Sequence, residues 1–85
     1  MAYEILFAKR AFDQFGKLEK DVREKIADKL ETICDDPFKH VRKLHGFNLY
    51  RLRVGDYRVI MSIEKGKLIV FVLEVGHRNT VYRKY

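Results

Sequence analysis

Three arginines interrupt an apolar hairpin in the second half of the sequence. Residues 50–61 read Tyr-Arg-Leu-Arg-Val-Gly-Asp-Tyr-Arg-Val-Ile-Met, and Gly55-Asp56 separates two runs of strand-forming residues. Arg51, Arg53 and Arg58 stand at strand positions that an ordinary core would give to apolar or uncharged residues. Arginine stays charged in proteins, and its planar fork of donors suits phosphate. The hairpin therefore predicts a surface that holds a polyanion.

Alternation along the strands predicts which way these side chains point. Successive strand residues face opposite sides of a sheet, so Arg51 and Arg53 share a face and Leu52 takes the other. Leu52 belongs to an apolar set, which predicts that it faces the core and that the two arginines face solvent. Arg58 lies across the turn and can join them.

The end of the last strand supplies further candidates. It reads Val-Gly-His-Arg at positions 75–78, and an antiparallel pairing with residues 57–63 would bring His77 and Arg78 near the same end of the sheet as Arg58. Tyr82 follows within reach. The predicted site consists of Arg51, Arg53, Arg58, His77, Arg78 and Tyr82.

This set can bind backbone phosphates, stack a base and stabilise charge on a pentavalent phosphate. We expect no metal and no cofactor, because the three histidines are far apart and no carboxylate pair accompanies them. Each residue also has a structural explanation: Arg58 could pair with Asp56 or Glu74, His77 could serve the turn, and Tyr82 could anchor the tail. The prediction depends on their co-location.

Length and charge narrow the class of protein. The 85 residues predict one domain spanning 1–85, too small for a deep pocket around a large cofactor. Residues 1–41 carry eight Lys/Arg and nine Asp/Glu, a charge of −1, whereas residues 42–85 carry ten and three, a charge of +7. A basic half of this kind favours a nucleic-acid partner.

Cys34 is the single cysteine, so no intrachain disulfide can form, and its place in a helical pattern predicts a buried thiol. No apolar run approaches the length of about 20 residues that a membrane span needs. We therefore expect a cytoplasmic protein without a membrane partner.

The apolar periodicity predicts an α+β fold with both helices on one face of a sheet. Asp35-Asp36-Pro37 ends the second helix, a basic connection follows over 38–48, and the almost wholly apolar last strand should be buried on both faces. The expected elements are an N-terminal strand (3–7), a helical hairpin (8–18 and 20–34), a three-stranded antiparallel meander (49–54, 57–63 and 68–75) and a short tail (76–85).

Three motifs carry a resemblance to a known family. They are Lys-Leu-x-Gly at 43–46, Tyr-Arg-x-Arg-x-Gly-Asp-Tyr-Arg-Val-Ile at 50–60 and Val-Gly-His-Arg-x-x-x-Tyr at 75–82. With the helical hairpin before them, they resemble the RelE side of the RelE/ParE toxin superfamily over essentially the whole chain. The resemblance implies a RelE-like fold and the toxin of a type II toxin–antitoxin pair, a ribosome-dependent mRNA endonuclease that works without metal.

The resemblance also implies a mechanism. The ribose 2′-OH of an A-site codon attacks the adjacent phosphate and leaves a 2′,3′-cyclic phosphate and a 5′-OH end. Arg58 and Arg78 would clamp the phosphate, Arg78 or His77 would protonate the leaving oxygen, and Tyr82 would stack on or orient a base. Arg51 and Arg53 would hold mRNA and ribosomal RNA, with further RNA contacts from Lys43, Arg83 and Lys84. The expected partner is a RelB-like antitoxin, in a heterodimer or heterotetramer.

One departure leaves the general base open. The best-known RelE pattern has lysines on the basic strand, one of them the base, where this chain has Arg51 and Arg53. Arginine hardly deprotonates, whereas histidine titrates near neutral pH, so the base stays open between His77 and Arg53. Two alternatives to the nuclease also stay open. They are a ParE-type toxin that binds DNA gyrase and a catalytically silent RNA- or ribosome-binding relative.

Overall fold

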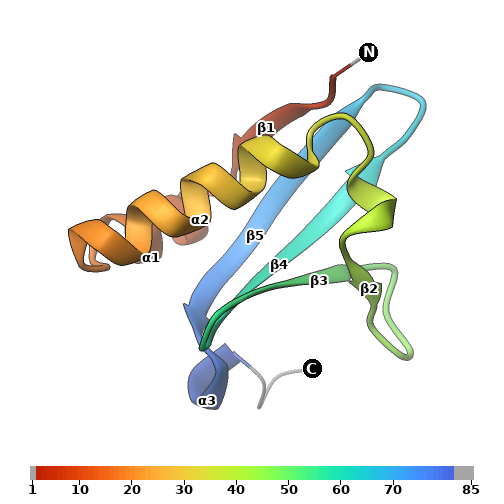
Figure 1. Ribbon diagram of the computed structural model, residues 1–85. Helices are drawn as coiled ribbons and strands as arrows, with labels where there is room; N and C mark the ends of the chain where they lie inside the picture. The colour runs from red at the N-terminus through yellow and green to blue at the C-terminus, as the bar shows by residue number, and fades with distance from the viewer. Residues whose placement is uncertain (1, 82–85) are drawn as a thin grey trace.

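One sheet of five strands organises the part of the chain that the structure, a computed structural model, describes, namely residues 2–81. Its strand order is β1-β5-β4-β3-β2 (Figure 1). β1 runs parallel to β5, and the other neighbours are antiparallel. The strands are β1 (Glu4–Phe7), β2 (Arg42–Lys43), β3 (Tyr50–Val54), β4 (Tyr57–Glu64) and β5 (Ile69–His77).

Two helices follow β1 as a hairpin, α1 (Lys9–Gly16) and α2 (Lys20–Ile33). The Arg23 guanidinium donates a hydrogen bond of 2.7 Å to the Leu18 carbonyl and so fixes the bend between them. Asp21 lies in the first turn of α2, where a negative charge suits the helix dipole. A 3₁₀ turn, η1 (Pro37–Lys39), then leads to β2, and a short α3 (Arg78–Val81) follows β5.

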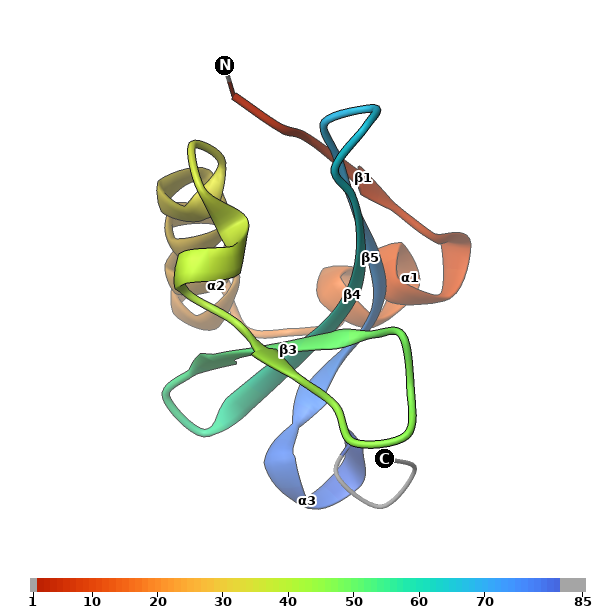
Figure 2. The same ribbon diagram turned by 90° about the vertical axis from the view of Figure 1, so that its right-hand side faces the viewer.

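The core lies between α2 and one face of the sheet. Figure 2 shows α2 standing to one side of β4 and β5, which are seen nearly edge-on. Helical spacing along α2 turns Ile26, Leu30 and Ile33 toward the sheet, where all three are buried. Their partners are the inward residues of the strands and one residue of α1, namely Leu52, Val59, Met61, Val70, Val72, Val75 and Ala11.

Helix α1 lies along an edge of β5. β1 pairs with β5 only at residues 69–72, which leaves the second half of that edge without a strand partner from β1. The Ala8 N–H still donates to the Val72 carbonyl at 2.8 Å, and the chain then turns into α1. Further along, the Val75 N–H donates to Gln14 Oε1 at 2.8 Å. A helix side chain thus continues the hydrogen bonding of the strand edge.

The structure confirms the predicted α+β fold, with its N-terminal strand, helical hairpin and antiparallel meander. The basic connection over 38–48 contains two short elements that the sequence did not predict, namely η1 and β2, and β2 pairs Arg42 with Arg51. A strand of two residues is too short for a periodic pattern. Residues 76–81 were wrongly placed in a tail, since they extend β5 and form α3.

Burial of the last strand on both faces is wrong as well. Phe71 is 36% exposed, and Leu6, its register partner on β1, is 37% exposed. Both lie on the face of the sheet away from α2. Cys34, expected to be buried, is half-buried at the end of α2. No helix in residues 2–81 is both long enough and apolar enough to span a membrane.

The Gln14 contact predicts a measurable part of the stability. Gln14→Ala would leave the Val75 N–H buried without this acceptor, which costs about 1–3 kcal/mol. Urea unfolding followed by circular dichroism measures the loss. Gln14→Glu keeps an acceptor oxygen and Asp13→Ala alters an exposed neighbour, so both should stay closer to wild type. Equal stability of Gln14→Ala and wild type would show that the helix does not hold the strand edge.

Candidate functional site

Strand register divides the basic side chains between the two faces of the sheet. Residues that pair directly across antiparallel strands point to the same side. Leu52 pairs with Val59 in the core, so its neighbours Arg51 and Arg53 point to the opposite face. Arg53 pairs with Arg58, and Arg51 pairs with Arg42. We call this surface the arginine face, and its members are Arg42, Arg51, Arg53 and Arg58.

Arg58 is the buried member of the arginine face. It is 5% exposed, whereas Arg53 is exposed and Arg51 is half-buried. Its Nη1 donates to the Tyr57 carbonyl at 3.2 Å and lies 3.5 Å from the Gly55 carbonyl. These contacts hold a permanent charge at the β3–β4 turn, where Gly55 has a φ of +59°. A fixed, partly desolvated guanidinium interacts strongly with an anion because local screening is weak.

Arg78 lies at the same end of the sheet. Its backbone N–H donates to the Asp56 carbonyl at 2.9 Å, so α3 begins beside the β3–β4 turn. Figure 1 shows α3 next to this turn. Arg58 pairs with Gly76, only two residues before the exposed Arg78. The structure thus brings together, at one end of the sheet, the two arginines that were predicted to share a phosphate.

His77 reaches the predicted end of the sheet, but it points to the face opposite Arg58. It pairs with Tyr57, and the two rings meet edge to face with centroids 5.5 Å apart. Its Nδ1 accepts the Asn79 N–H at 3.3 Å. Alternation puts Tyr57 and His77 opposite to Arg58. Nearness in sequence fixes the end of a strand but not the face.

The remaining predicted residues divide into two groups. Lys43 is exposed on β2, and its pairing with Tyr50 turns it away from the arginine face. Tyr82, Arg83 and Lys84 lie outside the described residues.

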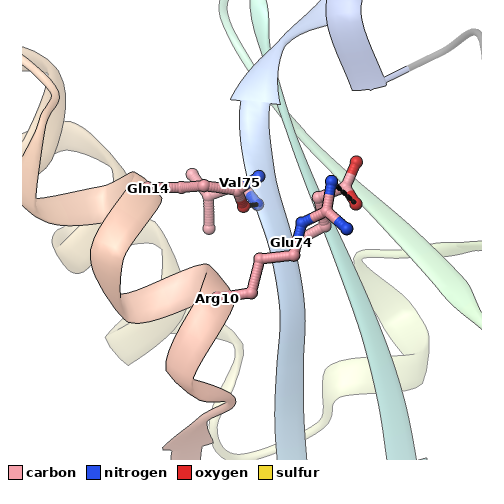
Figure 3. A network of polar contacts seen from close by, with 4 residues as sticks. All are labelled: Arg10, Gln14, Glu74 and Val75. Carbon is pink, nitrogen blue, oxygen red and sulfur yellow. Dashed lines mark hydrogen bonds and ion pairs between the residues drawn. The ribbon is translucent and has the colours of Figure 1, made fainter.

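Three charged residues at this site were missed by sequence reasoning. Arg42 extends the arginine face at its β2 edge, and Arg10 reaches from α1 across β5 toward Glu74 (Figure 3). Glu74 is only 4% exposed, and its Oε1 lies 3.6 Å from Arg10 Nη2. The one signal in the sequence was Glu74 itself, an acid within an apolar strand. Its partner on α1 depends on tertiary packing.

The surroundings of the site are basic and carry no cluster of metal ligands. Within residues 2–81, no three His, Cys, Asp or Glu side chains gather as a bound metal ion would require.

An apolar cavity of about 310 Å³ lies elsewhere, between β1, α1 and α2, with Phe7, Phe15 and Cys34 in its wall. Burial raises the pKa of the Cys34 thiol, and the charges of Asp35 and Glu31 raise it further. This cysteine therefore stays protonated.

Comparison with known proteins gives the same picture of the chain. A family model described as the ParE toxin of the type II toxin–antitoxin system parDE matches residues 5–82. The mRNA interferase toxin RelE of Escherichia coli K12 is 36% identical over 82 residues, which are 93% of this chain and 86% of that protein. This chain belongs to the RelE/ParE toxin family. Its resemblance to that family, first read from three motifs, is confirmed.

Solved members of the family have the same fold. RelE in the intact E. coli RelBE toxin–antitoxin complex superposes with a TM-score of 0.76 at 33% identity, over 89% of this chain and 96% of that one. In the RelBE2 complex of Mycobacterium tuberculosis the TM-score is 0.85, over 92% of this chain and all of that one. Identity there is 21%, so that likeness supports the fold alone.

The environment of Cys34 predicts low thiol reactivity. A raised pKa lowers the thiolate fraction at neutral pH, and the thiolate is the form that alkylates. Iodoacetamide should therefore modify Cys34 several-fold more slowly than free cysteine at neutral pH, with a rate that climbs steeply as the pH is raised. Mass spectrometry of timed samples measures both rates. Alkylation as fast as that of free cysteine would contradict the expected protonated thiol.

Proposed function

We propose that this chain is a RelE-type toxin that cleaves mRNA in the ribosomal A site without a metal ion. The meeting of Arg58 and Arg78 at one end of the sheet carries this proposal. β4 positions Arg58, and α3, which begins beside the β3–β4 turn, positions Arg78. The relatives that are named mRNA interferases support the reaction class.

The reaction is an attack of the ribose 2′ oxygen on the adjacent phosphorus. The P–O5′ bond breaks, and the products end in a 2′,3′-cyclic phosphate and a 5′-hydroxyl. Negative charge grows on the phosphate oxygens in the transition state, so donors fixed in advance accelerate the reaction. Arg58 and Arg78 supply these donors, and Arg78 gives the leaving 5′ oxygen its proton. His77, turned toward Tyr57, supports the turn on which Arg78 depends.

The other predicted residues hold the substrate. Arg51 and Arg53 lie on the arginine face beside Arg58 and bind the backbone of mRNA and ribosomal RNA. Arg42 extends this track toward the β2 edge. Tyr82 stacks on a base, and Lys43, Arg83 and Lys84 add RNA contacts.

A free nuclease of this kind would arrest its host, so we propose a RelB-like antitoxin as its partner. The solved relatives in complex with RelB support this proposal. An acidic, amphipathic antitoxin segment could cover the arginine face and block RNA by competition for the same guanidinium groups. We expect a heterodimer or a heterotetramer.

Gyrase binding is the second candidate, because the matching family model carries the ParE description. It predicts arrest without RNA cleavage and assigns no role to a phosphate clamp. The RelE names among the relatives favour the nuclease.

The phosphate clamp predicts the effect of removing either arginine. Arg78→Ala and Arg58→Ala should each lower the cleavage rate by about 10²–10³-fold, as loss of a fixed oxyanion donor does. Primer extension on an mRNA undergoing translation measures the cuts. Arg58 is buried, so its variant needs a thermal melt as a check of folding. Lys65→Ala, exposed at the opposite hairpin, serves as the matched control and should cut normally.

Unchanged cleavage by the folded Arg78→Ala variant would contradict the clamp. Growth arrest by wild type without any cuts would move the assignment to gyrase or to a silent binder.

A further inference from the structure

The arginines and the histidine of the proposed site offer no good general base for the 2′-OH. Arg51 and Arg53 replace the family's lysines, and a guanidinium that stays charged has no lone pair with which to accept a proton. His77 stacks on Tyr57 at the opposite face, and its Nδ1 accepts the Asn79 N–H. Among the described residues, we therefore expect the base to be another side chain on the face that carries Arg58.

Glu74 occupies such a position. It pairs across β4 with Ile60, and Arg58 pairs with Gly76, so Glu74 and Arg58 are diagonal neighbours on one face. Diagonal positions in an antiparallel pair lie about 7–8 Å apart, a span that a long side chain and a bound phosphate can bridge. Gly76 places only backbone at the position directly across from Arg58. A nucleotide held by Arg58 would therefore present its ribose near Glu74.

Arg10 pairs with the Glu74 carboxylate. Its guanidinium reaches across β5 to Glu74 at 3.6 Å, while 61% of its own side chain stays exposed (Figure 3). A long ion pair with one exposed partner is weak, so a competing phosphate can draw the guanidinium away. Arg10 then binds the RNA backbone and no longer pairs with the carboxylate.

We propose that Glu74 is the general base of this toxin, an inference that rests on the proposed nuclease function. Its carboxylate takes the proton of the 2′-OH while the 2′ oxygen bonds to phosphorus. The P–O5′ electron pair leaves with the 5′ oxygen, which takes a proton from Arg78. The carboxylic acid then returns its proton to water, and water protonates Arg78.

Other charged groups nearby define the controls. The cations that share the face with Glu74 are Arg10 from α1, Arg58 from β4 and Arg51 in the same cross-strand row. Glu64 points to the same face but pairs with Ile69 at the far end of the sheet. Asp56 is exposed in the β3–β4 turn and uses its backbone carbonyl to hold Arg78. Glu64→Gln and Asp56→Asn therefore serve as matched controls for Glu74→Gln, because each removes one carboxylate and leaves Glu74 in place.

The test is single-turnover cleavage by the full chain on ribosomes programmed with a short mRNA. Glu74→Gln should lower the maximal rate by about 10²–10⁴-fold, the usual contribution of a general base, with little change in the protein concentration that gives half-maximal rate. Glu64→Gln and Asp56→Asn should stay near wild type. In Glu74→Gly, sodium formate should restore part of the rate, and sodium chloride at equal ionic strength should not.

Each result decides a different claim. A Glu74→Gln rate within tenfold of wild type overturns the assignment and leaves the nuclease function standing. A large loss that formate does not restore also overturns it, because a merely positioning carboxylate would behave in that way. If Glu74→Gln does not melt cooperatively, Glu74→Asp is tested instead. It keeps the charge but draws the carboxylate back by one methylene, so a base in contact with the 2′-OH should lose rate, and a wild-type rate would overturn the assignment. No cleavage by wild type overturns the proposed function itself.

Discussion

The register of β3, β4 and β5 is the constraint on which the rest of this molecule depends. Leu52, Val59 and Val75 form one cross-strand row beneath α2, and burial of that row fixes the pairing of all three strands. Because side chains alternate, a slip of one residue would exchange this row for the neighbouring arginines. The core would then have to accept permanent charges at a prohibitive cost in desolvation. The hydrophobic row therefore specifies the position of the arginine face.

Two further features refine that face. Arg58 and Glu74 are buried on it, so their charges lie in a less polar environment than a flat surface offers. Helix α1 holds the edge of β5 through Gln14 and Arg10, just before the strand reaches Gly76 and α3. The helix that contributes Ala11 to the core thus also anchors the end of the strand that carries Arg78.

The periodicity of apolar residues in the sequence predicted the helices, the longer strands and the faces of the β3 side chains. Helical spacing located α2, and period-two alternation gave the opposed faces of Leu52 and Arg53. The face of His77 could not be predicted, because it follows from the exact pairing with Tyr57 and not from proximity. The Arg10–Glu74 pair joins residues 64 positions apart and depends on where α1 lies along β5, which no local pattern encodes. Strand β2 was not predicted, because two residues are too few to show a periodic pattern.

The chemistry of the new RNA ends is the most direct test of the account. Purified protein would be added to ribosomes that translate a defined mRNA, and the fragments would be analysed for their termini, with a matched mRNA that carries a 2′-deoxy residue at the cut site. The account predicts 2′,3′-cyclic phosphate and 5′-hydroxyl ends, and no cut at the deoxy position. A 5′-phosphate end, or cleavage at the deoxy position, would show that the 2′ oxygen is not the nucleophile and would contradict the mechanism.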